Sequence, residues 1–408
     1  MVVAPDVPAV YGARTMHTRL LVPALATLGA ALARATAMAQ PQSDRGTFVT
    51  RLGVDTIAIE TFARSNDRIE GDVAIRNPRT RTIHYVATLG SNGTIARFEM
   101  SSVFASAPAG TPPVIERVST VTDTTLVTEV RRNGVRDTTA SGSATLPVRG
   151  AVPFVQSGVA FFEQMVRQLR TSGRDSIEIP QYTFGPNHAF PSFVRRIGRD
   201  SVEINVGVPL LGVVDKHGRL AGLSGRATTV KTETARTPFV DLTSIIDSWA
   251  KRERAGNMPG AVSARDTVRA QVGTVDVWLD YGRPMRRGRA IFGALVPWDS
   301  VWRTGANAAT QFRVSRDVTI GGADVPAGTY TLWTIPTRTG ATLIVNKQNG
   351  QWGTQYDSTQ NLVRIPLRVT TVSQPVERFT MEVTSTGAET VLRYRWDMRE
   401  FSVPIFVK

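Results

Sequence analysis

The sequence contains no cysteine, which excludes disulfide bonds, thiolate metal sites and a cysteine nucleophile. Histidine is also scarce, with four in 408 residues, and only His84, His188 and His217 lie beyond the N-terminal segment. These three are far apart in the sequence, and none has a carboxylate beside it or a partner at His-x-x-x-His spacing. The sequence therefore gives no indication of a histidine base or a metal site, and we expect no cofactor.

Lysine is nearly absent as well. Only five of the 48 basic residues are lysine, and the formal net charge is +14. This charge is spread evenly, because residues 40–264 and residues 265–408 each carry +6. Proteins that bind nucleic acid usually concentrate positive charge on one face or segment, so the even spread favours diffuse surface charge and no nucleic-acid partner.

Long hydrophobic runs are missing too. The longest, Leu20–Ala33, has 14 residues, whereas a helix that spans a bilayer needs about 20. It follows a short basic segment and precedes a small-x-small cleavage pattern at Ala37–Ala39. Residues 1–39 are therefore predicted to be a signal peptide, with residues 1–15 as an extension from a misplaced start codon. We expect a periplasmic or secreted chain that begins at Gln40 and has no membrane span.

The full chain has the composition of a globular protein, with 41% hydrophobic and 20% charged residues. The length leaves room for two or three domains. We predict a first β-rich domain over residues 40–250, a linker over residues 251–264 and a second β-rich domain over residues 265–408. The linker is predicted because this segment combines charge, glycine and proline without periodicity.

The first domain shows the pattern of an antiparallel meander. Apolar and polar residues alternate from Ile69 to Ile75, and Val54–Phe62 and Thr82–Leu89 are rich in β-branched and aromatic residues. The pairs Asn92-Gly93 and Asn133-Gly134 favour tight hairpins. Further strands are predicted at residues 176–179, 201–206, 210–214 and 227–234.

Two helices interrupt these strands. Apolar residues at three- and four-residue spacing predict a helix over Phe154–Arg170 that ends at Gly173, and a second helix is predicted over Leu242–Arg254. A meander with one inserted helix resembles the half-open barrels of periplasmic lipoprotein carriers, in which a curved sheet wraps a helix around an apolar cavity. A sheet-plus-helix fold with a filled core is the alternative.

The second domain differs in composition, because six of the seven tryptophans lie after residue 277. Short strands are predicted at residues 273–279, 309–315, 330–335, 342–346, 363–370, 378–384 and 391–396. Short strands at regular intervals predict a β-sandwich or a jelly-roll-like module. The predicted fold class is therefore mainly β, with two antiparallel β-rich domains.

Several motifs of this second domain are recognisable together. They are Asp280–Pro284, Gly288–Gly293, Val301–Asn307, Pro326–Tyr330, Ile335–Pro336 and Trp352–Gly353. In combination they resemble the bacterial family known as domain of unknown function 2911, over about residues 266–405. The resemblance implies a secreted or envelope protein and brings no established activity, and residues 40–264 lie outside it.

These motifs supply the candidate ligand-binding residues, which are arginines, aromatics and an asparagine in glycine-rich loops: Tyr281, Arg283, Arg289, Trp302, Arg303 and Asn307. The guanidinium groups can form a cradle for an anion, because each presents a rigid fork of donors. Alternatively they pair with Asp280 and Asp299 and hold the loops in place. The aromatic rings either stack on a sugar or fill the core.

Two functions remain as hypotheses. The first is a secreted or periplasmic, non-catalytic protein that binds an anionic, glycan or lipid-like small ligand, or a cell-envelope protein. The second is a carboxylate-dependent hydrolase acting on glycans or esters, for which Asp276 and Asp280 are the candidates because they share one face of a predicted strand. No histidine follows residue 217, and no Gly-x-Ser-x-Gly or phosphate-binding loop motif is present.

Overall fold

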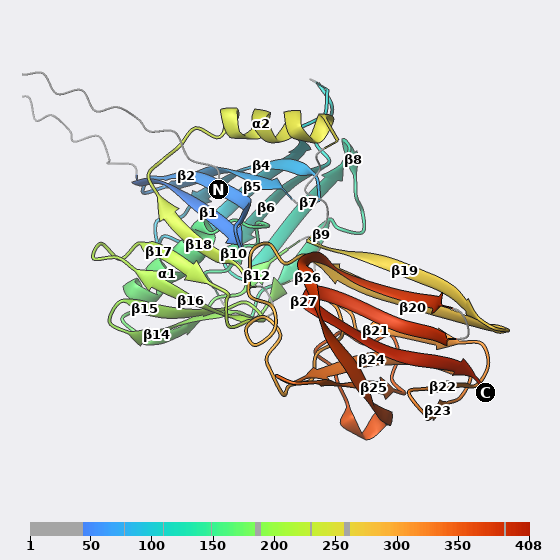
Figure 1. The fold of residues 1–408 in the computed structure, drawn as a ribbon. Helices are drawn as coiled ribbons and strands as arrows, with labels where there is room; N and C mark the ends of the chain where they lie inside the picture. Colours follow the sequence, from blue (N-terminus) through green and yellow to red (C-terminus); the bar gives the residue numbers. More distant parts are fainter. Residues whose placement is uncertain are drawn as a thin grey trace, which may run out of the picture. The chain divides into compact units, whose positions relative to one another are not determined.

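The computed structural model describes residues 44–408, except residues 77, 109, 148, 184–188, 229–230, 257–261 and 387–388. The predicted signal peptide, the expected mature N-terminus, His188 and the centre of the predicted linker lie outside these residues. The described chain is mainly β, with antiparallel sheets and two α-helices, as predicted (Figure 1).

The N-terminal part forms one 15-stranded antiparallel sheet. Its first run comprises β1 (Asp44–Leu52), β2 (Asp55–Arg64), β3 (Arg68–Arg76), β4 (Thr80–Leu89), β5 (Ile95–Phe104), β6 (Ile115–Thr122), β7 (Thr125–Arg132), β8 (Val135–Arg136) and β9 (Gly142–Thr145). Its second run comprises β11 (Ser176–Glu178), β14 (Phe193–Gly198), β15 (Ser201–Asn205), β16 (Pro209–Val214), β17 (Leu220–Ser224) and β18 (Glu233–Thr237). Because β18 pairs with β1, the second run continues the sheet beyond β1.

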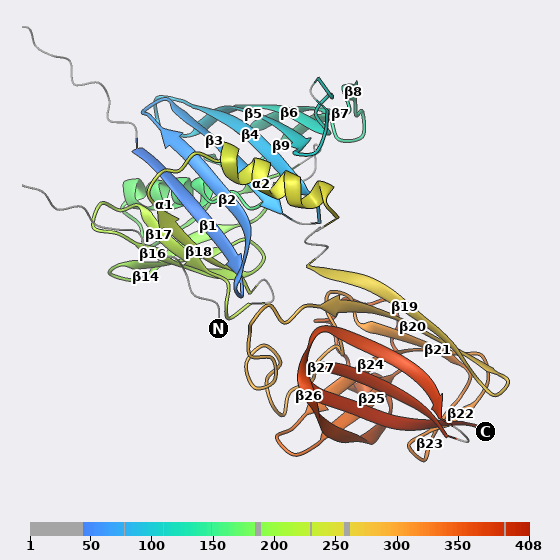
Figure 2. The same ribbon diagram turned by 45° about the horizontal axis from the view of Figure 1, so that its top comes forward.

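Helix α1 (Ala160–Ser172) packs inside this sheet, which bends around it (Figures 1 and 2). Its apolar side chains Phe161, Met165 and Leu169 share one core with strands of both runs, such as Phe62 of β2 and Ile204 of β15. The first and last strands of the sheet, β11 and β8, are not paired with each other, so the barrel is not closed. Apolar side chains of both runs pack around α1 in this interior.

Helix α2 (Thr243–Arg254) covers the opposite face of the sheet. Its Trp249 and the preceding Leu242 pack on Ile59 and Ala74, which alternate along β2 and β3 with the residues that face α1. A small third sheet has three strands. Its strand β10 (Val152–Pro153) precedes α1 in the chain, and its strands β12 (Gln181–Tyr182) and β13 (Ala189–Phe190) follow α1. The two helices therefore lie on opposite faces of one sheet.

The C-terminal part has its own nine-stranded sheet. Its strands are β19 (Ser263–Val272), β20 (Val275–Pro284), β21 (Thr310–Val314), β22 (Val318–Ile320), β23 (Ala323–Val325), β24 (Gly328–Pro336), β25 (Ala341–Asn346), β26 (Asn361–Thr386) and β27 (Glu389–Val407), with a 3-10 turn at Ser358–Gln360. The long strands β26 and β27 join two layers. Phe312 and Leu332 of one layer share a core with Phe379 and Tyr394 of the other, which gives the sandwich-like arrangement that was predicted.

Several element boundaries differ from the predictions. Helix α1 begins at Ala160 rather than Phe154. The strand predicted at residues 227–234 is replaced by β17 and β18, and the two strands predicted at residues 363–370 and 378–384 are one bent strand, β26. Residues 251–254 of the predicted linker form the last turn of α2, and Ser263 begins β19.

Candidate functional site

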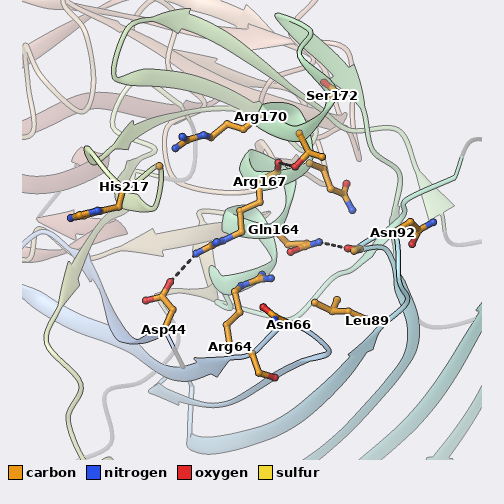
Figure 3. A pocket seen from close by; sticks show the side chains of 15 residues that line it. Asp44, Arg64, Asn66, Leu89, Asn92, Gln164, Arg167, Arg170, Ser172 and His217 are labelled. Atoms are coloured by element: carbon orange, nitrogen blue, oxygen red, sulfur yellow. Dashed lines mark hydrogen bonds and ion pairs between the residues drawn. The ribbon is translucent and has the colours of Figure 1, made fainter. Parts of the chain in front are cut away.

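A pocket of about 900 Å³ opens beside the C-terminal half of α1, within the bend of the N-terminal sheet (Figure 3). Its lining side chains are polar or charged except for Leu89: they include Asp44, Arg64, Asn66, Asn92, Gln164, Arg167, Gln168, Arg170, Ser172 and His217. An apolar cavity of the kind found in lipoprotein carriers would need a different lining. This pocket suits a polar ligand.

The register of strands β1 and β2 brings Asp44 and Arg64 together at the pocket. Asp44 of β1 lies directly opposite Arg64 of β2 in the antiparallel ladder. In antiparallel strands, directly opposed residues have their side chains on the same face of the sheet. Both side chains therefore reach the pocket from the same side, while Gln164 and Arg167 reach it from α1.

A tight turn between β16 and β17 supplies another wall. The Asp215 carboxylate accepts hydrogen bonds from the backbone N–H groups of His217 (2.9 Å) and Arg219 (2.9 Å). Gly218 has φ +77°, and a Cβ atom there would collide with the Arg170 guanidinium. Glycine suits this position because of its positive φ, and its missing Cβ leaves the space that the Arg170 guanidinium occupies.

Buried ion pairs hold α1 against the sheet. Glu163 is fully buried, and its carboxylate accepts hydrogen bonds from Arg236 Nη1 (2.6 Å), the Leu220 N–H (3.0 Å) and Arg167 Nη2 (3.3 Å). Asp44 accepts from Arg167 Nη2 (2.8 Å) and Arg236 Nη2 (2.9 Å). The buried charge of Glu163 is thus paired, as a buried carboxylate requires, whereas Asp44 and Arg167 are partly exposed.

A second buried carboxylate holds the N-terminus of α1. Glu60 of β2 accepts hydrogen bonds from the N–H groups of Val159 (2.6 Å) and Ala160 (3.0 Å) and from the Tyr85 hydroxyl (2.7 Å). Burial raises the pKa of Glu60 to about 7, although these hydrogen bonds oppose the rise. Gly71 leaves the space that the Tyr85 hydroxyl occupies.

Arg64 differs from the paired arginines. Its side chain is buried, with a relative exposure of 9%, and neither Nε nor Nη2 has a hydrogen-bond partner among the described residues. Burial, together with the neighbouring Arg167 charge, lowers the pKa of Arg64 to about 10. The nearby charges of Glu163 and Asp44 oppose this lowering, although no hydrogen bond from Nε or Nη2 reaches either carboxylate among the described residues. A buried guanidinium with unbonded nitrogens is costly, so a role beyond packing is indicated.

Other side chains around the pocket also have unpaired polar atoms. Within the described part of the chain, Gln164 Oε1, Arg167 Nε and Gln168 Nε2 are buried without a hydrogen-bond partner. Together with Nε and Nη2 of Arg64, these make five unpaired atoms, and all of them except Gln164 Oε1 are donors. A ligand that offers several acceptor oxygens, such as a carboxylate or an oxyanion, would satisfy them. The described residues contain no group of histidine and carboxylate side chains that could hold a metal ion.

The six residues predicted as a site all lie in the C-terminal part, and the structure divides them. Tyr281 and Trp302 are in the core, with relative exposures of 1% and 8%, and both rings pack against Phe379. The Tyr281 hydroxyl accepts from the Met381 N–H (3.1 Å), and Trp302 Nε1 donates to the Gly305 carbonyl (3.1 Å). Their surroundings are those of the core-filling alternative.

Arg283 and Arg289 are engaged within the fold. Arg283 donates to the Phe379 carbonyl (3.1 Å), to Asp266 (2.7 Å) and to the Thr380 hydroxyl (2.7 Å), so its carboxylate partner is neither Asp280 nor Asp299. Asp280 is bound instead by Arg265 (2.9 Å).

Arg289 donates to the carbonyl oxygens of Met285 and Arg286. Arg283 lies in β20 rather than in the predicted loop and ties this strand to β19 and β26. Arg289 holds its own loop in place. Both roles are structural, as the alternative proposed, although through other partners.

Arg303 and Asn307 remain as the more open pair. Arg303 Nη1 donates to the Asn307 carbonyl at 3.3 Å, and Asn307 is exposed with φ +65°. Together with Arg289 and Trp302 they line one pocket. Burial lowers the pKa of Arg303. The structure thus brings four of the six predicted residues to one place, with only Arg303 and Asn307 loosely held.

Sequence reasoning missed the pocket beside α1. Its residues come from three strand ends, three turns and a helix that are far apart in the sequence, and no motif links them. One signal was available, because Glu163, Gln164, Arg167 and Gln168 form a polar stripe on a helix that the meander encloses. Likewise, His84 has Asp72 as its cross-strand neighbour (2.9 Å), although no carboxylate adjoins it in the sequence.

Comparisons with known proteins give little for the N-terminal part. No curated protein matches the chain. Among solved structures, a DUF1089 family protein from Pseudomonas aeruginosa has 9% sequence identity and a TM-score of 0.30, over 42% of this chain and 92% of its own. A GH43 glycoside hydrolase with an engineered active site has 10% identity and a TM-score of 0.12, over 88% of this chain and 81% of its own. Both likenesses are too weak to support an argument about function.

The C-terminal part is different, because a family model matches it. The matched residues, 263–405, contain all the motifs that were recognised in the sequence and all nine strands of the C-terminal sheet apart from the end of β27. Residues 263–405 thus match the family described as protein of unknown function (DUF2911), as the sequence motifs predicted.

Proposed function

We propose that this protein is a secreted or periplasmic, non-catalytic binding protein, and that its N-terminal sheet holds a small polar anion in the pocket beside α1. The observation that carries the proposal is Arg64, a buried guanidinium whose Nε and Nη2 atoms lack partners in the described structure. Unpaired donors of Arg167 and Gln168 around the same pocket support it.

The lining favours a compact anion over a lipid. Leu89 is the one apolar side chain among the pocket residues, so a fatty chain would find little apolar surface there. A carboxylate, phosphate or sulfate group can instead accept two hydrogen bonds from one guanidinium. A small acidic metabolite or an acidic sugar fits this chemistry.

Calorimetric titration of the full mature chain with phosphate, sulfate, citrate and glucuronate would test the proposal. At least one of these anions should bind, and at one hundred times its Kd it should raise the free energy of unfolding by about 2.7 kcal/mol. Arg64→Met should abolish binding. The exposed Arg97, which pairs with Glu99 (2.6 Å), provides the matched control, and Arg97→Met should bind normally.

The stability of Arg64→Met without ligand shows whether Arg64 has a binding role or a structural role. Arg64→Met removes a buried charge whose Nε and Nη2 have no partner among the residues that the structure describes, so the unfolding free energy without ligand should stay equal or rise. A loss of several kcal/mol in Arg64→Met, or the absence of binding to every anion tested, would contradict the proposal.

Secretion is the second part of the proposal, and it is supported by the apolar run Leu20–Ala33 and the cleavage pattern at Ala37–Ala39. Mass spectrometry of the chain exported from a bacterial host should give a mature N-terminus at Gln40. Recovery of a chain that retains Leu20–Ala33 would argue against it. Among the described residues, no helix is long and apolar enough to cross a bilayer.

The hydrolase alternative finds no comparable support. Asp276 and Asp280 do share one face of β20, but four residues along a strand place their Cα atoms about 13 Å apart. Glycosidase carboxylates lie roughly 5–9.5 Å apart. In addition, Trp278 stands between them on that face, and Asp280 is bound by Arg265. We therefore give this alternative no further weight.

A further inference from the structure

A row of side chains crosses the outer face of the C-terminal sheet. Arg269 of β19 lies opposite Trp278 of β20, Trp278 lies opposite Arg313 of β21, and Arg313 lies opposite Thr329 of β24. The row therefore places an indole between two guanidinium groups on four neighbouring strands. These residues also line one hollow of about 930 Å³, which Asp276 and Ser315 border.

Trp278 is not needed to fill the core. Its neighbours Val277 and Leu279 are buried in the core, whereas Trp278 points to the opposite face and is only half-buried. Within the described ranges it has no ring contact and no hydrogen bond, although Trp298, Trp302, Trp333 and Trp396 all pack against other rings. A large aromatic side chain on a solvent face is more informative than one in a core.

The two flanking arginines are also without partners. Neither Arg269 nor Arg313 has an ion pair or a hydrogen bond to its side chain among residues that the structure describes, whereas the nearby Arg265 and Arg283 each bind an aspartate. One acidic group borders the hollow: Asp276 accepts from Gln271 Nε2 (3.2 Å), and its N–H donates to the Ser315 hydroxyl (2.8 Å). The row still carries more positive than negative charge.

We propose that this row, Arg269–Trp278–Arg313, is a binding site for an acidic oligosaccharide. A pyranose ring would stack its C–H face on the Trp278 indole, and the guanidinium groups would pair with carboxylate or sulfate groups of the sugars on either side. Because neighbouring strands lie about 4.8 Å apart, the two arginines are held about 10 Å apart with the indole midway. This arrangement matches a chain of sugars laid across the strands better than it matches a single small anion.

Affinity electrophoresis of the full mature chain would test the site with two matched polymers, dextran and dextran sulfate, and with polygalacturonate as a carboxylated probe. Migration should be retarded by polygalacturonate, dextran sulfate or both, and unaffected by neutral dextran. Trp278→Ala and Arg313→Gln should each weaken the retardation at least tenfold. Trp278→Phe, which keeps a flat ring, should retain most of it.

Two control variants exclude simple attraction between a cationic protein and a polyanion. Arg364→Gln removes an exposed arginine of β26 that is also unpaired among the described residues, and Trp352→Ala removes a tryptophan that is 51% exposed outside the row. Both should bind as the unmodified chain does.

If Trp278→Ala bound the acidic polymers as well as the unmodified chain does, the proposal would be overturned. This substitution leaves the net charge of the chain unchanged, so such binding would need only charge. Equal losses in Arg313→Gln and Arg364→Gln would overturn the proposal as well, because non-specific charge would then explain the retardation. Binding of a single-stranded oligonucleotide as tight as that of the acidic polymers would overturn the assignment to sugars. Thermal melts of each variant would exclude a loss of folding.

Discussion

Buried charged residues in the N-terminal part serve two different purposes. Glu163 and Arg236 bind each other, so that breaking the pair would leave one charge buried alone. Arg64 lies nearby, and within the described part of the chain its Nε and Nη2 have no such partner. A protein gains nothing in stability from a buried unpaired guanidinium, and for this reason Arg64, rather than the better bonded Arg236, is the residue that we connect with a ligand.

Glu60 predicts a pH dependence of stability. Its pKa in the folded chain is about 7, above its ordinary value of 4.5, so the folded state binds the proton more tightly than the unfolded state. The contribution of this proton to stability is complete below about pH 4.5 and is lost as the pH rises through 7. The loss amounts to about 3 kcal/mol.

The measurement compares the unmodified chain with Glu60→Gln, whose amide imitates the protonated acid. Denaturant unfolding at pH 4.5 and pH 8 should show that the unmodified chain loses about 3 kcal/mol relative to Glu60→Gln over this interval. Glu99→Gln, at an exposed pair with Arg97, should show no such change. The assignment would be refuted if the difference in unfolding free energy between the two chains stayed constant with pH. It would also be refuted if the unmodified chain gained stability relative to Glu60→Gln as the pH rose.

Arg283 and Arg303 should respond differently to truncation. Arg283→Ala removes three hydrogen bonds and leaves Asp266 without its partner, so we expect a loss of about 2–3 kcal/mol. Arg303 makes one bond of 3.3 Å, so Arg303→Ala should cost about 1 kcal/mol or less. Equilibrium unfolding of both variants measures this contrast. Losses of equal size would mean that Arg303 is as structural as Arg283.

The sequence predicted which kinds of contact these arginines make better than it predicted which residues they contact. It indicated that an aspartate is the alternative to a ligand for Arg283, but it placed Arg283 in a loop, whereas this residue lies in β20. The aspartate is Asp266, because the register of β19 against β20 brings it within reach, and a register cannot be read from an isolated motif. The same reason hides the pocket beside α1, where Asp44 and Arg64 meet only through strand pairing.

At the scale of elements, the start of α1 shows where periodicity is insufficient. The apolar spacing from Phe154 onward predicts a helix, but the chain becomes helical only at Ala160. Residues 152–153, just before the predicted start, form β10, and the Glu60 carboxylate binds the N–H groups of Val159 and Ala160. An acceptor 99 residues earlier in the chain thus fixes the first turn, and it takes the place of a capping side chain in the helix sequence.

The end of α1, in contrast, was predicted from local sequence. Gly173 is the C-cap in the left-handed region, with φ +66°, and no atom lies within 4 Å of the position that a Cβ would take. Gly173→Ala should therefore cost only the backbone penalty, about 1 kcal/mol, and Gly173→Asn should cost less, because asparagine tolerates this conformation. Thermal unfolding of the two variants measures the difference. An alanine variant as stable as the unmodified chain would contradict the assigned cap.

At the scale of the whole molecule, the cores are confined to separate stretches of chain. The buried apolar residues around α1 run from Phe48 to Leu223, and those of the C-terminal sheet run from Val272 to Ile405. Neither core includes a residue from the other stretch. Each stretch is long enough to bury a core of its own.

This separation predicts that the C-terminal part folds alone. The cut belongs at Val262, before β19, rather than inside the predicted linker at residue 251, because residues 251–254 complete α2. Residues 262–408 expressed alone should be soluble and should unfold in one cooperative transition, since the core from Val272 to Ile405 is kept whole. Circular dichroism during heating measures the transition. An insoluble product, or a melt without a transition, would show that the C-terminal sheet depends on the rest of the chain, and the two-domain organisation predicted from the sequence would then be wrong.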